Sequence, residues 1–225
     1  MDTIFSFFSE QGFMQLDHLM WACPELVAGI AQIQELTGVT AEYAGSHEGL
    51  GTCNALLSLG QDSYLEVIAP DPQQSLQDNF GGRLAQLDHG GLLAYAMTVK
   101  DLSAWRHELS AAGFKPGAVR RARRTTAAGQ ALEWALLFVR FPGAPFYIDW
   151  LECQHPATTS PGGAELIRLN VAVPNLEVYR TLLGTENLSP LLNLREASTF
   201  SLQAELTTPN GGVTLPPLDA DISLL

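Results

Sequence analysis

A strand-to-helix pattern occurs three times in this chain, and it restricts the fold more than any other feature. Residues 16–26 read LDHLMWACPEL, residues 92–102 read LLAYAMTVKDL, and residues 166–176 read LIRLNVAVPNL. Each copy starts with a mostly apolar run of about eight residues, which is typical of a strand. Each ends with a proline or lysine, then an acid or asparagine, then a leucine, which is typical of a helix start. The pattern therefore predicts three repeated units.

Each predicted helix has apolar residues at helical spacing, and each ends at a glycine, namely Gly38, Gly113 or Gly184. Further strands are predicted after each helix. They are residues 39–44, 54–59 and 64–69 in the first unit, 118–125, 132–141 and 146–152 in the second, and 200–207 and 213–215 in the third. The third unit therefore reads as a shorter, βαββ-like version of the other two.

Charge and cysteine content exclude several classes of protein. The chain has 12 basic and 24 acidic residues in 225, a net charge of −12, which argues against nucleic acid or an anionic membrane as a partner. No apolar run approaches the roughly 20 residues that span a bilayer. The first 13 residues lack a basic stretch before their apolar patch, so we expect a packing segment there rather than a secretory signal. Three scattered cysteines favour a reducing cytoplasm.

A carboxylate recurs at one place in the first two units. Residues 64–68 read YLEVI and residues 147–151 read YIDWL, so that Glu66 aligns with Asp149 inside an apolar strand. A carboxylate in such a strand is costly unless it is paired or bound to a metal. The repeat therefore predicts a site shared by the two units.

The order and spacing of several segments resemble the vicinal oxygen chelate superfamily, and within it the glyoxalase-like domain family. The segments are LDHLMWACPEL, HEGLGTCNALLSLG (47–60), YLEVIAPDP (64–72), LEWALLF (132–138) and PFYIDW (145–150). The resemblance implies an α+β fold in which tandem βαβββ modules form a curved-sheet cup, with a truncated third βαββ-like unit. We expect an N-terminal packing segment over residues 1–13, the paired modules over 14–156, and the third repeat over 160–225, packed on the same domain.

The resemblance also implies a divalent metal, such as Fe, Mn, Zn or Ni, held in the cup. Transferred to this sequence, the ligand positions are His18 and Glu66 in the first module, and Ala94 and Asp149 in the second. One imidazole and two carboxylates are similar to the facial triad that holds iron or manganese. Ala94 offers no ligand, so the site departs from the four-ligand pattern. The alternative is a structural role, in which His18 is a hydrogen-bonded core residue and the two carboxylates pair with arginines.

Other residues are candidates for catalysis and substrate binding. Glu66 or His47 would move a proton, although His47 lies in a glycine-rich loop and could equally be an exposed loop residue. Asn54 could bind a substrate carbonyl group, and Trp134 could form a wall of the pocket. Four arginines lie in VRRARRTT, where period-two alternation separates Arg123 from Arg124. One of these faces could hold an anionic substrate, and the alternative is a solvated edge strand.

Two classes of small-molecule function follow, besides a scaffold or interaction protein whose site has decayed. The first is a metal-assisted lyase, isomerase or dioxygenase that acts on a small carbonyl or hydroxy compound through an enolate or oxyanion. The second is a protein of the same fold that binds or sequesters a small ligand without turnover. The fold alone does not choose between them. Two full modules are sufficient to form the cup within one chain, so either a monomer or a homodimer is compatible.

Overall fold

The computed structural model describes residues 14–60, 62–125, 131–184 and 189–220. The predicted packing segment 1–13 and the predicted turn around residues 128–129 lie outside the described residues. The first half of the chain contains β1 (Gln15–Ala22), α1 (Leu26–Thr37), β2 (Glu42–His47), β3 (Thr52–Ser58), β4 (Tyr64–Pro70), α2 (Phe80–Leu84), β5 (Gly91–Thr98) and α3 (Leu102–Ala111). The second half contains β6 (Arg120–Thr125), β7 (Ala131–Leu137), β8 (Phe146–Asp149), a 3₁₀ turn (Pro156–Thr158), β9 (Glu165–Val173), α4 (Leu176–Leu182), β10 (Leu192–Glu196), β11 (Ser201–Thr208) and β12 (Gly211–Leu215).

The three predicted strand-to-helix units are confirmed. The helices α1, α3 and α4 start after an N-cap whose side chain accepts hydrogen bonds from the first helical turn, and the caps are Glu25, Asp101 and Asn175. Such a cap satisfies N–H groups that have no partner within the helix. The glycines that follow the helices have a positive φ, as at Gly38 with φ of 75°, a conformation that glycine adopts without steric cost.

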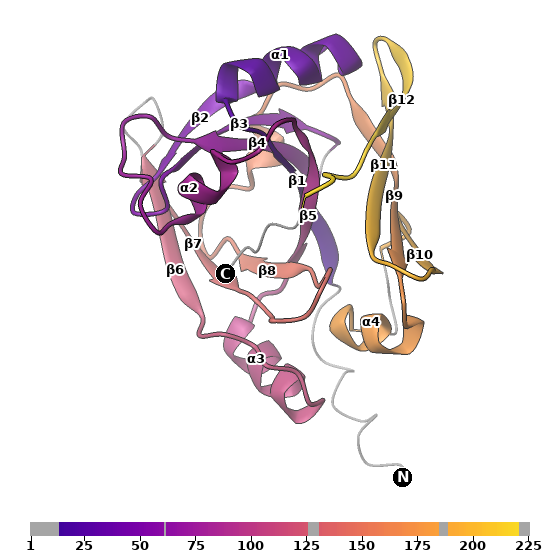
Figure 1. Cartoon of the computed structure of the whole chain (residues 1–225). Coiled ribbons are helices and arrows are strands. Elements are labelled where there is room, and N and C mark those ends of the chain that lie inside the picture. Colours follow the sequence, from indigo (N-terminus) through magenta and orange to yellow (C-terminus); the bar gives the residue numbers. More distant parts are fainter. Residues whose placement is uncertain (1–13, 61, 126–130, 185–188, 221–225) are drawn as a thin grey trace.

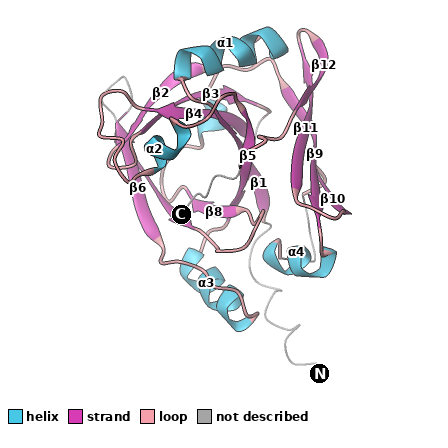
Figure 2. Cartoon of the chain, in the orientation of Figure 1, coloured by secondary structure: helices cyan, strands magenta, loops and turns pink. Residues whose placement is uncertain are grey.

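The first two units form one strongly curved sheet, which confirms the predicted cup. The strand order is β2-β3-β4-β1-β5-β8-β7-β6. In each unit the first strand is parallel to the last, and the antiparallel pair β1–β5 joins the two units. The edge strands β2 and β6 contact each other, so that the sheet curves into a nearly closed ring (Figure 1). Figure 2 shows α1 and α3 outside this ring.

The third unit builds its own four-stranded sheet in the order β10-β9-β11-β12. It contains one strand more than the sequence indicated, β10, which is half-exposed and pairs with β9 in parallel. The segment LNLRE gives little hydrophobic signal, and this explains why the sequence pattern did not reveal a strand there. The first strand of this unit, β9, is parallel to β10 and antiparallel to β11, whereas within each cup module the first strand pairs with a parallel strand, β4 or β8.

The alternation of side chains along the strands creates two apolar regions. Leu19, Trp21 and Tyr95 point outward into a large core that also includes Leu169 and Leu202 of the third unit. Met20, Ala94, Ala96, Phe146 and Ile148 belong to a second cluster on the inner face of the cup. A common core therefore joins the curved sheet to the third unit, while the domain boundaries at 156 and 160 stay a prediction. Among the described residues, none of the helices has the length and apolar character that crossing a membrane requires.

Candidate active site

A cavity of about 380 Å³ lies inside the curve of the eight-stranded sheet. Because successive residues of a strand point to opposite faces, alternate residues of several strands reach this cavity. We call it the cup cavity. Among its lining residues are His18, Asn54, Glu66, Arg124, Trp134 and Trp150.

Asp17 and His18 form a hydrogen-bonded pair at one wall of the cup cavity. Asp17 Oδ1 lies 2.7 Å from His18 Nδ1, and both side chains are buried. The pairing of β1 with β5 shifts register between Leu16 and His18, and such a bulge changes the direction in which side chains point. A carboxylate acceptor at Nδ1 favours the tautomer whose proton is on that nitrogen, which leaves the Nε2 lone pair free.

The second oxygen of Asp17 ties the first module to the second. Asp17 Oδ2 accepts hydrogen bonds from Thr98 Oγ1 at 2.7 Å and from Trp150 Nε1 at 3.0 Å. It also lies 3.2 Å from His155 Nε2. Burial alone would raise the pKa of Asp17, but the hydrogen bonds with His155 and His18 outweigh burial and hold this pKa well below its ordinary value. Asp17 is therefore ionised and orients His18.

Glu66 lies between two imidazole rings. Its Oε2 is 3.7 Å from His18 Nε2, and its Oε1 is 3.9 Å from His47 Nε2. Asn54 Nδ2 donates a hydrogen bond of 2.7 Å to Glu66 Oε1. Because β3 and β4 are antiparallel neighbours that place Asn54 opposite Ile68, the amide lies beside the carboxylate. The site thus holds a fixed carboxylate within reach of both histidines.

Arg124 is the buried cation of the cavity, with 8% of its surface exposed. Its Nη1 donates to Asn54 Oδ1 at 3.3 Å, and its Nε has no hydrogen-bond partner among the described residues. Burial lowers the pKa of Arg124, whereas Tyr64 and Glu66 raise it, and a guanidinium remains charged in proteins at neutral pH. A guanidinium that lines a cavity can donate hydrogen bonds to a carboxylate or enolate oxygen of a ligand.

Aromatic rings form much of the remaining wall. The rings of Trp134 and Trp150 are 5.5 Å apart between centroids and tilted by 43°. The ring of Tyr64 stacks on His18 at 4.5 Å. Phe138 and Phe146 stack at 5.4 Å. Flat apolar walls of this kind favour a planar, aromatic portion in the ligand.

The structure brings together most of the residues singled out from the sequence. His18, Glu66, His47 and Asn54 meet in the cup cavity, with Arg124 and Trp134 beside them. Arg123 lies at the exposed rim, where its Nη2 is 2.9 Å from Glu48 Oε2. Ala94 is buried on the inner apolar face.

Asp149 corrects the prediction that three ligands converge. Its neighbours Ile148 and Trp150 line the cavity, so Asp149 points to the other face of β8, where its Oδ1 accepts a hydrogen bond from the backbone N–H of Leu151. Tyr147 likewise packs in the outer core. The alignment of residues 64–68 with 147–151 is therefore shifted from the structure by an odd number of residues. Such a shift along a strand moves every side chain to the opposite face of the sheet.

The residues present do not fit the predicted metal triad. His18 and Glu66 could supply two ligands, but the third predicted ligand is on the opposite face of the sheet, and the guanidinium of Arg124 shares the cavity. Within the described part of the chain, no three His, Cys, Asp or Glu side chains are grouped to hold a metal ion. A reaction in this cavity that relies on protein side chains alone is therefore the better fit to the residues present.

Sequence reasoning missed Asp17, Tyr64, Trp150 and His155. Asp17 offered a signal, because an acid next to a histidine within an apolar strand must find hydrogen-bond donors. Trp150 and His155 reach Asp17 from positions more than 130 residues away along the chain. No local pattern shows such contacts.

His47 makes a prediction for the pH dependence of stability. Its ring is buried, and its Nδ1 lies 3.0 Å from Thr52 Oγ1. Burial, opposed in part by Glu66, lowers the pKa of His47 below its ordinary value. The unfolded chain therefore takes up a proton as pH falls through about 6.5, while the folded chain does not, and stability is lost over this range.

We expect His47→Gln to make the free energy of unfolding less sensitive to a change from pH 7.5 to pH 5.5, as measured by urea denaturation at each pH. His107→Gln, which changes an exposed histidine on α3, is the matched control and should keep the slope of the wild type. Equal slopes for all three proteins would show that His47 is protonated in the folded state.

The comparisons with known proteins agree with this architecture. A family model described as a glyoxalase-like domain matches residues 16–186. Among solved structures, a hypothetical protein from Staphylococcus aureus has a TM-score of 0.60 and 14% identity, and the match covers 84% of this chain and 88% of that chain. That likeness shows the fold. No curated protein matches the chain.

Two other solved structures match a smaller part of the chain. Streptomyces coelicolor methylmalonyl-CoA epimerase, in complex with 2-nitronate-propionyl-CoA, has a TM-score of 0.43 and 18% identity, and the match covers 61% of this chain and 98% of that chain. Methylmalonyl-CoA epimerase from Mycobacterium tuberculosis has a TM-score of 0.42 and 20% identity, with 60% and 85% covered.

Proposed function

The chain belongs to the glyoxalase-like domain family, of the vicinal oxygen chelate superfamily, and on that premise we propose that its cup cavity catalyses proton transfer at the carbon beside the carbonyl group of a small aromatic oxo acid. The observation that carries the proposal is the buried pair of Asp17 and His18, whose free imidazole nitrogen faces the cavity beside Glu66 and Arg124.

Substrate binding rests on Arg124 and the aromatic wall. The carboxylate of the acid accepts hydrogen bonds from the guanidinium of Arg124, which lines the cup cavity. The aromatic group of the substrate packs against Trp134 and Trp150. The proposal requires the carbon beside the carbonyl group to lie between Arg124 and His18.

Proton transfer rests on His18. Its Nε2 takes a proton from the carbon, so that a C–H bond breaks, an N–H bond forms, and the electron pair moves into the enolate. The carboxylates of Asp17 and Glu66 stabilise the imidazolium, and Arg124 stabilises the enolate oxygen. The proton then returns to carbon or to the enolate oxygen, which yields exchange, inversion or tautomerisation without any redox partner. Positioned acid–base groups of this kind typically accelerate a reaction by about 10²–10⁴-fold.

Deuterium exchange tests the proposal directly. Phenylpyruvate is incubated with the protein in D₂O, and the methylene signal is followed by proton NMR. We expect the signal to disappear at least about 100-fold faster than in buffer that contains the same concentration of imidazole. Pyruvate, which lacks the ring, should exchange more slowly at equal concentration.

The alternative function, a non-catalytic ligand-binding protein, has its own outcome in this experiment. Phenylpyruvate that binds saturably, as seen by calorimetry, but exchanges at the buffer rate would favour sequestration, which the largely apolar wall of the cavity could also serve. If phenylpyruvate neither binds nor exchanges, both assignments of the cup cavity to an aromatic acid are wrong.

A further inference from the structure

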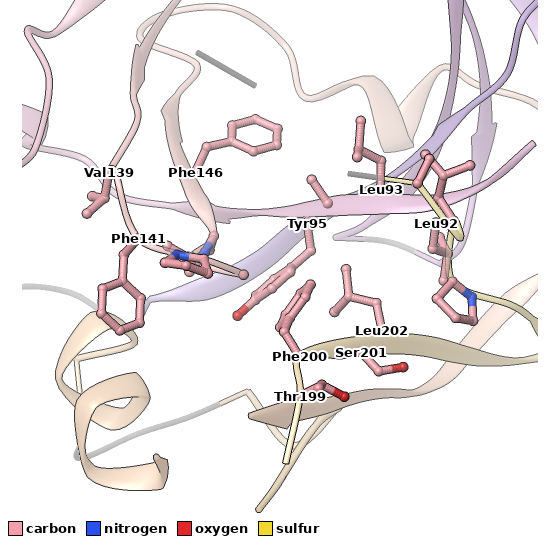
Figure 3. A pocket seen from close by; sticks show the side chains of 18 of the residues that line it. Leu92, Leu93, Tyr95, Val139, Phe141, Phe146, Thr199, Phe200, Ser201 and Leu202 are labelled. Carbon is pink, nitrogen blue, oxygen red and sulfur yellow. The ribbon is translucent and has the colours of Figure 1, made fainter. Parts of the chain in front are cut away.

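A second cavity lies between the curved sheet and the third unit, next to the cup cavity. Its volume is about 1530 Å³. It is bordered by the first half of β5, by residues 138–146, by the start of β11 and by residues 217–220. Figure 3 shows this space, which we call the outer cavity, with side chains from the curved sheet on one side and from the third unit on the other.

Apolar and polar surface line the outer cavity in nearly equal parts. Its apolar side chains include Leu93, Phe141, Phe146, Phe200 and Leu202, which come from the curved sheet, the third unit and the loops beside them (Figure 3). Phe146 also lines the cup cavity, where it stacks on Phe138. The two cavities are therefore neighbours with a shared aromatic wall. Ligand cavities in proteins typically measure roughly 300–1,000 Å³, so the outer cavity has room for a ligand of substantial length.

One buried tyrosine hydroxyl in this wall lacks a hydrogen-bond partner in the described part of the chain. Tyr147 donates to the backbone oxygen of Leu182 at 2.7 Å, and Tyr179 donates to the backbone oxygen of Pro142. Tyr95 is 0% exposed, and its hydroxyl has no hydrogen-bond partner among the described residues. A buried hydroxyl without a partner destabilises the folded state by about 1–3 kcal/mol. In Figure 3 this hydroxyl points toward the space between Phe141 and Phe200.

The remaining polar groups around the outer cavity indicate an uncharged ligand. Thr199 and Ser201 contribute hydroxyl groups, and among the described residues the rim has one exposed cation, Arg140, and one exposed anion, Asp219. These opposite charges give the cavity no net sign. A charged group near the buried Tyr95 would be desolvated without a counter-ion, and that is strongly unfavourable.

We propose that the outer cavity is a second ligand site and that it binds an uncharged amphiphile with a long aliphatic or aryl body. The body packs against Phe141 and Phe200, and one carbonyl or hydroxyl oxygen forms a hydrogen bond with the hydroxyl of Tyr95. Phe200, which is half-buried and lines the same cavity, turns aside to admit the oxygen. The site is independent of the chemistry in the cup cavity.

The test uses displacement of the uncharged fluorescent probe N-phenyl-1-naphthylamine by decan-2-one, with the full chain. Tyr95→Phe removes the hydroxyl and keeps the ring. We expect decan-2-one to bind about fivefold more weakly to this variant, the equivalent of one net hydrogen bond. Butylbenzene, which has no oxygen, should bind equally to both proteins. Decanoate should bind more weakly than decan-2-one to the wild type.

Stability measurements give a second, opposite signature. Without ligand, Tyr95→Phe should melt about 2–4 °C higher than the wild type, because an unpartnered buried hydroxyl is removed. The matched control is Tyr147→Phe, which loses a satisfied hydrogen bond to Leu182. It should melt lower and bind decan-2-one as the wild type does.

Three outcomes would overturn the proposal. The first is the absence of saturable decan-2-one binding to the wild type. The second is an equal loss of affinity for decan-2-one and butylbenzene in Tyr95→Phe, which would show a packing effect. The third is a decan-2-one affinity that changes in Trp134→Ala but not in Tyr95→Phe, because the ligand would then occupy the cup cavity.

Discussion

Replacement of His18 by alanine is expected to lower the rate of proton exchange on phenylpyruvate about a thousandfold, within the range typical of a lost acid–base group. The reason is geometric. His18 Nε2 faces the cup cavity, while its Nδ1 is fixed by Asp17 at 2.7 Å. The affinity for phenylpyruvate should change little, since Arg124 provides the main polar contact. Exchange followed by NMR and binding followed by calorimetry measure the two quantities separately.

Two further variants make this result interpretable. His107→Ala, on the exposed side of α3, is the control for removal of any imidazole and should exchange at the wild-type rate. Asp17→Asn keeps the His18 ring but replaces the carboxylate beside its Nδ1 by a neutral amide. The rate of exchange should therefore fall, although phenylpyruvate still binds. A His18→Ala protein that is folded, binds phenylpyruvate and exchanges at the full rate would exclude His18 as the proton carrier.

The second large effect is expected at Arg124. Arg124→Met should weaken binding of phenylpyruvate roughly 10- to 100-fold, because charged hydrogen bonds contribute about 1.5–3 kcal/mol. Arg124→Lys keeps the charge but loses the fork of N–H groups, and its affinity should be intermediate. Calorimetric titration measures the dissociation constant of each protein.

Phenylacetone, which has the ring and the carbonyl group but no carboxylate, separates charge recognition from packing at Arg124. Its affinity should be the same for the wild type and Arg124→Met. The control protein is Arg168→Met, which removes an exposed arginine on β9, outside the cup cavity. If Arg124→Met lowers the affinity for phenylacetone and for phenylpyruvate equally, the guanidinium supports the packing of the cavity wall and does not bind the carboxylate.

Local sequence signals were sufficient to predict the three strand-to-helix units, because caps such as Glu25 and Asp101 act within one turn of the helix. The alternation along β6 also separated a buried arginine from exposed ones. Arg124 is buried, whereas the side chain of Arg123 is 68% exposed. Period-two alternation is a property of the single strand, so it can be predicted without knowledge of the fold.

The failures have an equally physical cause. Asp149 was placed by aligning two tyrosines, but Tyr64 lines the cup cavity and Tyr147 packs in the outer core. Similar residues therefore serve opposite faces of the sheet, and similarity alone cannot fix the register. The function of Asp17 depends on a bulge and on partners from the second module, and neither leaves a trace near Asp17 in the sequence.

The hydrogen bonds of Asp17 also bear on how the chain folds. The carboxylate belongs to the first module, but Thr98, Trp150 and His155, which surround its second oxygen, belong to the second. A chain with only one module folded would leave a desolvated charge with too few donors, and such a state is disfavoured. The two halves are thus coupled through one buried anion, and partly folded intermediates are disfavoured at the same carboxylate that orients the imidazole. Assembly of the domain and completion of the cup cavity become a single event.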